Sequence, residues 1–271
     1  MKYHTFVELI RPLNGLMAGI GALIGWLIVG GTNMSAPFMA IVAPFFISSG
    51  GMVLNDYFDR HIDKNRPLQR KEITEKQLIS LTLALYATGL ILATIINITA
   101  GMVALLAIIL LTAYDAFLAK QPLTGNLMVG VNTGLTFVFG AALAGDPFHP
   151  AAAVLAVLAL FSTLARETYK GIQDMEKDRS TRQTLALTVG KKKASIFALA
   201  FNIIAILASP VPFILGIFGQ VYLGLILLIN LGFIYTSISA FKSEDLYIQS
   251  RNMKALQALA LITFIIGVIL K

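Results

Sequence analysis

The sequence predicts an all-α protein that crosses a membrane as a bundle of nine helices. Hydrophobic residues occupy 57% of its 271 positions, charged residues occupy 13%, and the mean hydropathy is +0.79. A membrane-spanning helix needs about 20 mostly apolar residues. The segments that meet this requirement are 13–30, 36–54, 78–98, 101–119, 126–145, 150–167, 194–217, 220–240 and 255–270. We expect one transmembrane domain over residues 1–271.

Basic residues are confined almost entirely to one side of this predicted bundle. They precede the first segment and recur after the second, fourth, sixth and eighth, and Lys271 alone falls on the other side. Because cytoplasmic loops collect Lys and Arg, we expect a multi-pass cell-membrane protein with its N-terminus inside and its C-terminus outside. The net charge of +7 then belongs to one face, which suits either anionic lipid head groups or a phosphorylated substrate.

The chain contains no cysteine, which excludes disulfides, thiol catalysis and Cys-ligated metal. Lys2, Glu8 and Arg11 precede the first apolar run, and no small-residue cleavage site follows them. We therefore expect no cleaved signal peptide.

The first segment begins at Arg11-Pro12 and carries an amide, Asn14, close to membrane depth. A buried amide needs partners, so Asn14 is either a helix cap or a site residue. Glycines follow at a spacing of four, as Gly15/Gly19 and Gly21/Gly25. This spacing favours close contact between helices.

The second segment ends in NDYFDRHID, residues 55–63, which is the main candidate for chemistry. On a helix, Asn55, Asp56, Asp59 and Asp63 fall within an arc of roughly 100°. Carboxylates this close repel one another, and a divalent cation relieves the repulsion. Oxygen ligands without Cys or paired His select Mg²⁺ or Mn²⁺. The alternative is a solvated acidic helix end that binds nothing.

The stretch KNRPLQRKEITEKQ places several cations directly after these carboxylates. Acid and base side by side suit a metal ion together with an oxyanion such as diphosphate. Anchoring to the cytoplasmic face is the other explanation for the same residues.

The fourth segment ends in YDAFLAKQ, which places Tyr114 and Asp115 inside an apolar run and Lys120 just after it. An ionisable residue at membrane depth is a candidate site residue. Lys120 is equally explained as an interface anchor, with Asp115 as its neighbour.

A second charged stretch, beginning RETYKGIQDMEKD, follows the sixth segment. Asp174 and Asp178 are i, i+4 neighbours on a helix, and Glu167 and Lys170 fall on the same side. Two acidic clusters, after the second and sixth segments, suggest two similar halves, about 1–119 and 120–240, plus a ninth helix. Duplication of this kind commonly places a site between the halves.

Taken together, these motifs resemble the UbiA superfamily of intramembrane prenyltransferases. The resemblance spans nearly the whole chain. It rests on the NDxxDxxxD pattern of residues 55–63, the following Asn65-Arg66-Pro67, the Tyr114…Lys120…Gly125-Asn126 run and the REx₆DxxxD pattern of residues 166–178.

The resemblance implies a nine-helix bundle, Mg²⁺ as cofactor, and transfer of an isoprenyl group from its diphosphate to an acceptor. The implied metal-binding residues, whose Asp members are also the implied catalytic residues, are Asn55, Asp56, Asp59, Asp63, Asp174 and Asp178. The implied substrate-binding residues are Asn14, Arg66, Tyr114, Lys120 and Lys170. The family pattern is departed from at Gly171, where many members have Asp, and at Leu68-Gln69, where many have Ser-Gly.

The members that the chain resembles most transfer geranylgeranyl to the free hydroxyl of geranylgeranylglyceryl phosphate. On this interpretation Arg70, Lys71 and Lys191–Lys193 are available to bind the acceptor phosphate. The expected partners are a prenyl diphosphate donor, a lipid phosphate acceptor and membrane lipids, with no nucleic acid and no obligatory protein partner. The alternatives are an aromatic acceptor such as 4-hydroxybenzoate and, more distantly, a cation transporter lined by carboxylates.

Overall fold

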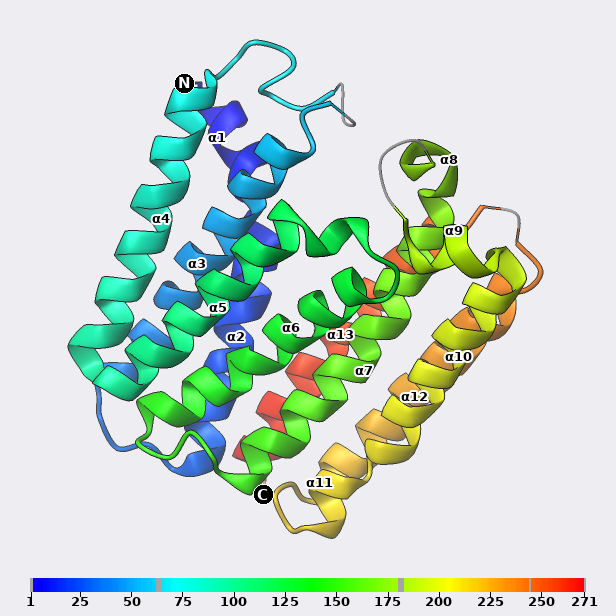
Figure 1. Cartoon of the computed structure of the whole chain (residues 1–271). Helices are drawn as coiled ribbons and strands as arrows, with labels where there is room; N and C mark the ends of the chain where they lie inside the picture. Colours follow the sequence, from blue (N-terminus) through cyan, green and yellow to red (C-terminus); the bar gives the residue numbers. More distant parts are fainter. Residues whose placement is uncertain (1, 62–64, 180–182, 244, 271) are drawn as a thin grey trace. The chain divides into compact units, whose positions relative to one another are not determined.

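The computed structural model describes residues 2–61, 65–179, 183–243 and 245–270. Within these residues all regular structure is helical (Figure 1), and nine helices are long and apolar enough to cross a membrane. The predicted fold class is confirmed. The spans are Pro12–Val29, Ala36–Phe58, Glu75–Ile96, Ile98–Ala116, Thr124–Leu143, Pro150–Gln173, Lys191–Ile214, Gln220–Ala240 and Tyr247–Ile269.

Several helices differ from the hydropathy segments at their ends, where charge enters the helix. The elements are α1 (Tyr3–Ile10), α2 (Pro12–Val29), α3 (Ala36–Phe58), α4 (Glu75–Ile96), α5 (Ile98–Ala116), η1 (Leu118–Lys120), α6 (Thr124–Leu143), α7 (Pro150–Gln173), α8 (Met175–Asp178), α9 (Leu185–Val189), α10 (Lys191–Ala208), α11 (Val211–Ile214), α12 (Gln220–Ala240) and α13 (Tyr247–Ile269). Both α3 and α7 extend past their apolar runs, which places acidic residues at helix ends. The seventh span is interrupted between α10 and α11, because Pro210 lacks the amide that would continue the helix.

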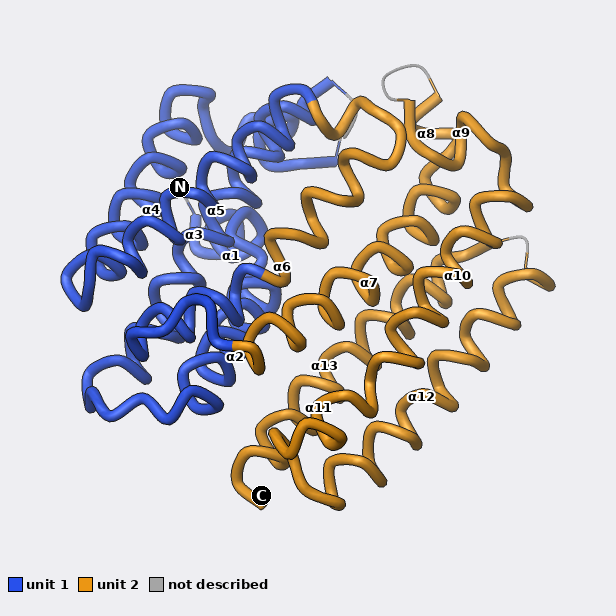
Figure 2. Tube along the Cα trace, turned by 60° about the horizontal axis from the view of Figure 1, so that its bottom comes forward, with its two compact units in different colours: residues 1–117, 135–149 blue, residues 118–134, 150–271 orange. Residues whose placement is uncertain are grey.

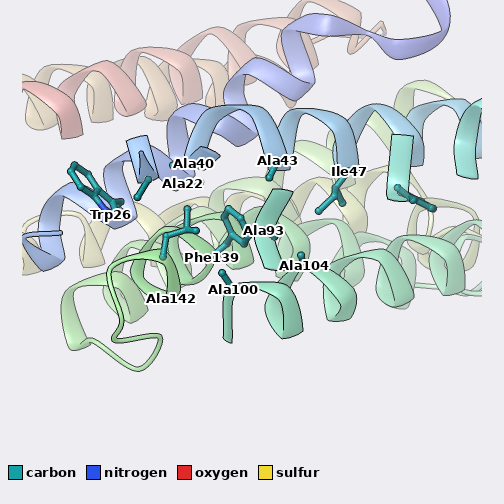
Figure 3. Close-up of a cluster of buried hydrophobic side chains, with 13 residues drawn as sticks. Ala22, Trp26, Ala40, Ala43, Ile47, Ala93, Ala100, Ala104, Phe139 and Ala142 are labelled. Atoms are coloured by element: carbon teal, nitrogen blue, oxygen red, sulfur yellow. The ribbon is translucent and has the colours of Figure 1, made fainter. Parts of the chain in front are cut away.

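The chain divides into two compact units (Figure 2). Unit 1 comprises residues 1–117 and 135–149. In it α3 packs on α1, α2, α4 and α5. The core is built largely from alanine around a few larger side chains, including Trp26, Ile47 and Phe139 (Figure 3).

Small residues allow the helices of unit 1 to approach closely, as the glycine spacing predicted. A Cβ at Gly19 would lie 2.9 Å from the Cα of Ile41 on α3, and one at Gly25 would lie 3.0 Å from the Cα of Phe137 on α6. The two glycine pairs of α2 therefore serve two different neighbours.

Unit 2 comprises residues 118–134 and 150–271. In it α7 packs on α10 and α13, and α12 packs on α10 and α13. Its buried core includes Tyr169, Phe233 and Met253. Within this core the Asn202 amide donates to the Phe233 carbonyl (3.2 Å) and to Ser237 Oγ (2.8 Å). These bonds join α10 to α12 inside the apolar span.

Candidate active site

Asp56 is the most deeply buried carboxylate among the described residues of the first acidic cluster. It lies in the last turn of α3 and is 1% exposed. Its Oδ1 accepts a hydrogen bond from Arg11 Nη2 at 2.5 Å and lies 3.7 Å from Arg66 Nε. A buried carboxylate is stable as an ion when it is paired. Two guanidinium groups supply that pairing here.

Arg11, which the sequence marks only as a basic residue before the first span, is the partner of Asp56. It connects α1 to α2 with φ 46° and ψ 65°, a left-handed conformation that is costly for a residue with a Cβ. Its Nη1 also contacts Met52 Sδ at 3.5 Å, and Asn14 Nδ2 contacts the same sulfur at 3.4 Å. Asn14 therefore lies beside the Arg11–Asp56 pair. The only sequence signal was the position of Arg11 directly before Pro12 and three residues before Asn14.

The helix that carries the first cluster ends within it. A helix through residues 55–63 would place the polar side chains on one face, but α3 ends at Phe58 and Asp59 is its C-terminal cap. At this end the Arg60 Nη1 donates to the Tyr57 carbonyl at 2.8 Å and so satisfies a carbonyl of the last turn. Asn55 and Asp56 lie on the helix and Asp59 at its end. Asp63 lies outside the described residues.

Asn55 is bound across the unit by Asp115. Its Nδ2 donates to Asp115 Oδ1 at 2.9 Å, and Asp115 on α5 is 4% exposed. Asp115 therefore belongs with the first cluster and is not merely a sequence neighbour of Lys120. Tyr114, the adjacent residue on α5, is half-buried.

The second cluster lies at the end of α7 in unit 2. The backbone amide of Asp174 donates to the Lys170 carbonyl and that of Asp178 to the Asp174 carbonyl, both at 2.9 Å. The two aspartates therefore lie one helical turn apart, but α7 ends at Gln173 and Asp174 caps the separate helix α8. Asp178 is buried, Asp174 is half-buried and Lys170 is exposed.

Two further features of unit 2 bear on this cluster. One turn before Lys170, buried Glu167 pairs with Arg166 Nη2 at 2.5 Å. Lys120 is exposed in η1, and its carbonyl accepts a hydrogen bond from the Gln183 amide at 3.1 Å. This bond ties the Lys120 turn to the segment that follows Asp178.

One of the basic residues expected near the acceptor phosphate is held by two carboxylates. The Arg70 guanidinium binds both Glu8 (2.6 Å) and Glu72 (2.9 Å). Lys191 Nζ donates to the Ser243 carbonyl at 3.0 Å, whereas Lys71, Lys192 and Lys193 are exposed.

The described donors fit Mg²⁺ in chemistry. Carboxylate and amide oxygens of Asn55, Asp56, Asp59, Asp174 and Asp178 are hard ligands of the kind Mg²⁺ prefers. Within the described ranges, no three His, Cys, Asp or Glu side chains are gathered closely enough to form a complete metal site by themselves.

Comparison with known proteins identifies the family. A profile of the UbiA prenyltransferase family matches residues 33–262, a range that contains both acidic clusters. The chain belongs to the UbiA prenyltransferase family. The predicted resemblance is therefore confirmed, and the protein is a membrane-embedded prenyltransferase.

Several curated members of this family are similar over nearly their whole length. Digeranylgeranylglyceryl phosphate synthase of Methanosarcina mazei is 35% identical, with 98% of each chain covered. The protein of the same name from Halobacterium salinarum is also 35% identical, with 96% of each chain covered.

Solved structures of UbiA proteins share the fold. A structure of digeranylgeranylglyceryl phosphate synthase is 32% identical, with a TM-score of 0.79 and 98% of each chain covered. An apo UbiA homologue from Aeropyrum pernix K1 has a TM-score of 0.85 at 18% identity, covering 95% of this chain and 99% of its own. A homologue from Archaeoglobus fulgidus, solved with GPP and Mg²⁺, has a TM-score of 0.74 at 17% identity, covering 98% of this chain and 100% of its own.

Proposed function

We propose that this UbiA prenyltransferase transfers a geranylgeranyl group from geranylgeranyl diphosphate to the free hydroxyl of geranylgeranylglyceryl phosphate. The products are digeranylgeranylglyceryl phosphate and diphosphate. The observation that carries the proposal is the near full-length similarity, at 32–35% identity, to proteins that bear the name of this synthase.

Mg²⁺ is the proposed cofactor. Asn55, Asp56 and Asp59, together with Asp63, would hold it on the first cluster, and Asp174 and Asp178 would hold it on the second. When bound, Mg²⁺ neutralises charge that develops on the leaving diphosphate. The UbiA homologue solved with GPP and Mg²⁺ supports this choice, as does the oxygen-only donor set.

The cations of the chain bind the remaining charge of the diphosphate. Arg66 already lies at Asp56, so it is placed to bind both the carboxylate and a phosphate oxygen. Lys120, Lys170 and Tyr114 are proposed for the same role, and Asn14 for the reacting end of the donor. Apolar side chains of the spans exclude water, which would otherwise capture the allylic cation that forms when diphosphate departs.

The acceptor is tested directly with purified protein in lipid vesicles. Labelled geranylgeranyl diphosphate and Mg²⁺ are supplied with geranylgeranylglyceryl phosphate in one reaction and 4-hydroxybenzoate in another. We expect labelled lipid only in the first reaction, and none after Mg²⁺ is chelated. Product with 4-hydroxybenzoate alone would refute the ether-lipid acceptor and leave an aromatic prenyltransferase.

We also propose the orientation given by the basic residues, with both acidic clusters on the cytoplasmic side. Geranylgeranyl diphosphate, a charged donor, would then reach the site from the cytoplasm.

A further inference from the structure

Arg70 lies in an unusually complete set of hydrogen bonds for a surface arginine. Its Nη1 and Nη2 donate to the two carboxylate oxygens of Glu8 at 3.2 and 2.6 Å. Its Nε and Nη2 donate to the two oxygens of Glu72 at 2.9 and 3.2 Å, and Nη1 also donates to the Asn65 carbonyl. All three nitrogens are engaged, and both carboxylates are bound in the bidentate geometry that gives an arginine pair its strength.

These bonds join two segments that are far apart in the sequence. Glu8 belongs to α1, whereas Arg70 lies in the turn between Asn65 and Glu72. Three backbone hydrogen bonds close that turn, from the amides of Arg70, Lys71 and Glu72 to the carbonyls of Arg66, Leu68 and Pro67. Thr5 of α1 adds a further bond to Glu72 at 2.7 Å.

An apolar cluster lies under the same junction. Leu9 and Ile10 of α1 pack in one cluster with Ile73 and Val53, and Leu68 of the turn packs against it. The hydrogen bonds of Arg70 and the apolar contacts of this cluster therefore both hold α1 against the turn. An isolated surface ion pair contributes little to stability, but a bidentate network on a packed base is the exception.

Each of the two joined segments carries one of the arginines at Asp56. Arg11 directly follows α1, and Arg66 begins the turn. Both guanidinium groups reach the same oxygen of the buried carboxylate. Arg70 thus connects the two backbone segments that carry Arg11 and Arg66. None of the bonds described above joins Arg70 to Asp56 itself.

We infer that Arg70, with Glu8 and Glu72, is a positioning residue that holds Arg11 and Arg66 at the donor diphosphate subsite and does not bind the acceptor phosphate. This inference rests on the proposed function for the identity of the donor. Because two carboxylates already neutralise the Arg70 guanidinium, a third anion would have to compete for its donors.

The test compares Arg70→Gln with Glu8→Gln. A positioning role for Arg70 predicts that Glu8→Gln weakens the enzyme as well, whereas a role in binding the acceptor phosphate predicts an effect of Arg70→Gln alone. If Arg70 is a positioning residue, both substitutions loosen the same junction. Each should lower kcat/KM for the prenyl diphosphate roughly tenfold or more and leave KM for the phosphate-bearing acceptor unchanged. The double variant should be little worse than either single variant. An increase of the acceptor KM in Arg70→Gln alone, with Glu8→Gln unaffected, would overturn the inference.

A binding measurement separates this inference from the proposed reaction. Calorimetry with Mg²⁺ and inorganic pyrophosphate requires neither turnover nor an acceptor. Both variants should bind pyrophosphate roughly tenfold more weakly than the parent protein, while Lys76→Gln, which removes a nearby exposed charge, should bind it normally. Unchanged affinity for pyrophosphate in both Arg70→Gln and Glu8→Gln would contradict the inference. Pyrophosphate binding by a parent protein that transfers no prenyl group would refute the proposed function alone.

Hydrogen exchange provides the structural readout. Peptides covering residues 65–72 should exchange faster in Arg70→Gln and Glu8→Gln than in the parent protein or Lys76→Gln. Unfolding temperatures of the variants, measured in detergent, identify any general loss of folding. Arg70→Lys should recover part of the pyrophosphate affinity, because lysine keeps the charge but loses the bidentate geometry.

Discussion

The Arg11 guanidinium lies 2.5 Å from the buried carboxylate of Asp56, although the two residues are 45 positions apart in the sequence. Arg11 makes this contact from a left-handed backbone conformation, directly before Pro12. Strained residues of this kind persist where the surrounding structure fixes them, and they are frequent at functional sites.

Replacing Arg11 should therefore destabilise the resting protein. Arg11→Gln leaves a buried carboxylate with Arg66 at 3.7 Å, and we expect a loss of about 1.5–3 kcal/mol in the free energy of unfolding. Asp56→Asn added to Arg11→Gln should recover part of that loss, because the uncompensated charge is gone. Denaturant unfolding in detergent without Mg²⁺ measures all three variants. Strict additivity of the single effects would show that the pair does not interact.

Asp59→Ala and Asp174→Ala should each remove turnover without unfolding the protein. Both side chains lie at helix ends and are only half-buried, so neither supports the core. As proposed Mg²⁺ ligands, each should lower kcat by about a hundredfold or more. The matched control is Asp146→Ala, an exposed aspartate in the α6–α7 connection. Full activity in both site variants would refute the proposed metal ligands.

Gly140→Ala should be strongly destabilising. The added Cβ would lie 2.7 Å from the Trp26 amide nitrogen and would also meet the Ala22 carbonyl. Because both obstacles are backbone, α2 and α6 would have to separate, at a cost of about 1–3 kcal/mol. Gly224→Ala is the control, since its Cβ would meet nothing within 4 Å and alanine favours the helix by about 0.5–1 kcal/mol. Equal unfolding temperatures for the two variants would contradict the close packing of α2 against α6.

The Arg70–Glu72 pair should make stability sensitive to acid. Hydrogen bonds from Arg70 and then Thr5 lower the pKa of Glu72 from 4.5 to about 2, and Glu8 and Glu72 raise the pKa of Arg70. Since the folded pKa of Glu72 lies below its unfolded value, its contribution is complete above about pH 4.5 and is lost as the pH falls toward about 2. Glu72→Gln should therefore show a smaller decrease in unfolding temperature across that interval. If the unfolding temperatures of Glu72→Gln and the parent protein fell equally across that interval, the Arg70–Glu72 pairing would be contradicted.

Cysteine labelling should test the orientation without background, because the chain has no cysteine. Lys76 is exposed in the first turn of α4, after the connection that follows the first acidic cluster. Phe148 is 90% exposed in the α6–α7 connection. In intact cells an impermeant maleimide should modify Phe148→Cys and should reach Lys76→Cys only after permeabilisation. The reverse pattern would invert the proposed topology.

Sequence reasoning located the acidic motifs but not the limits of the helix that carries the first of them. Residues 55–63 fit one helical face by spacing alone, yet α3 ends at Phe58, where the Arg60 side chain binds the Tyr57 carbonyl. Such a contact depends on the conformation of one side chain, which the spacing of polar residues does not predict. The interruption after α10 has a local cause instead, since Pro210 has no backbone amide to continue the helix.

The sequence by itself determined the nine spans, the family and the two acidic clusters, because hydropathy and motif spacing are properties of consecutive residues. Tertiary structure alone decided the partners of the charged groups. Asp56 pairs with Arg11, Asn55 binds Asp115 from 60 positions away, and Arg70 binds Glu8 from 62 positions away. In the linear sequence each of these is one polar group among many. The packing of α1, α3, α5 and the turn before α4 decides which of these groups meet.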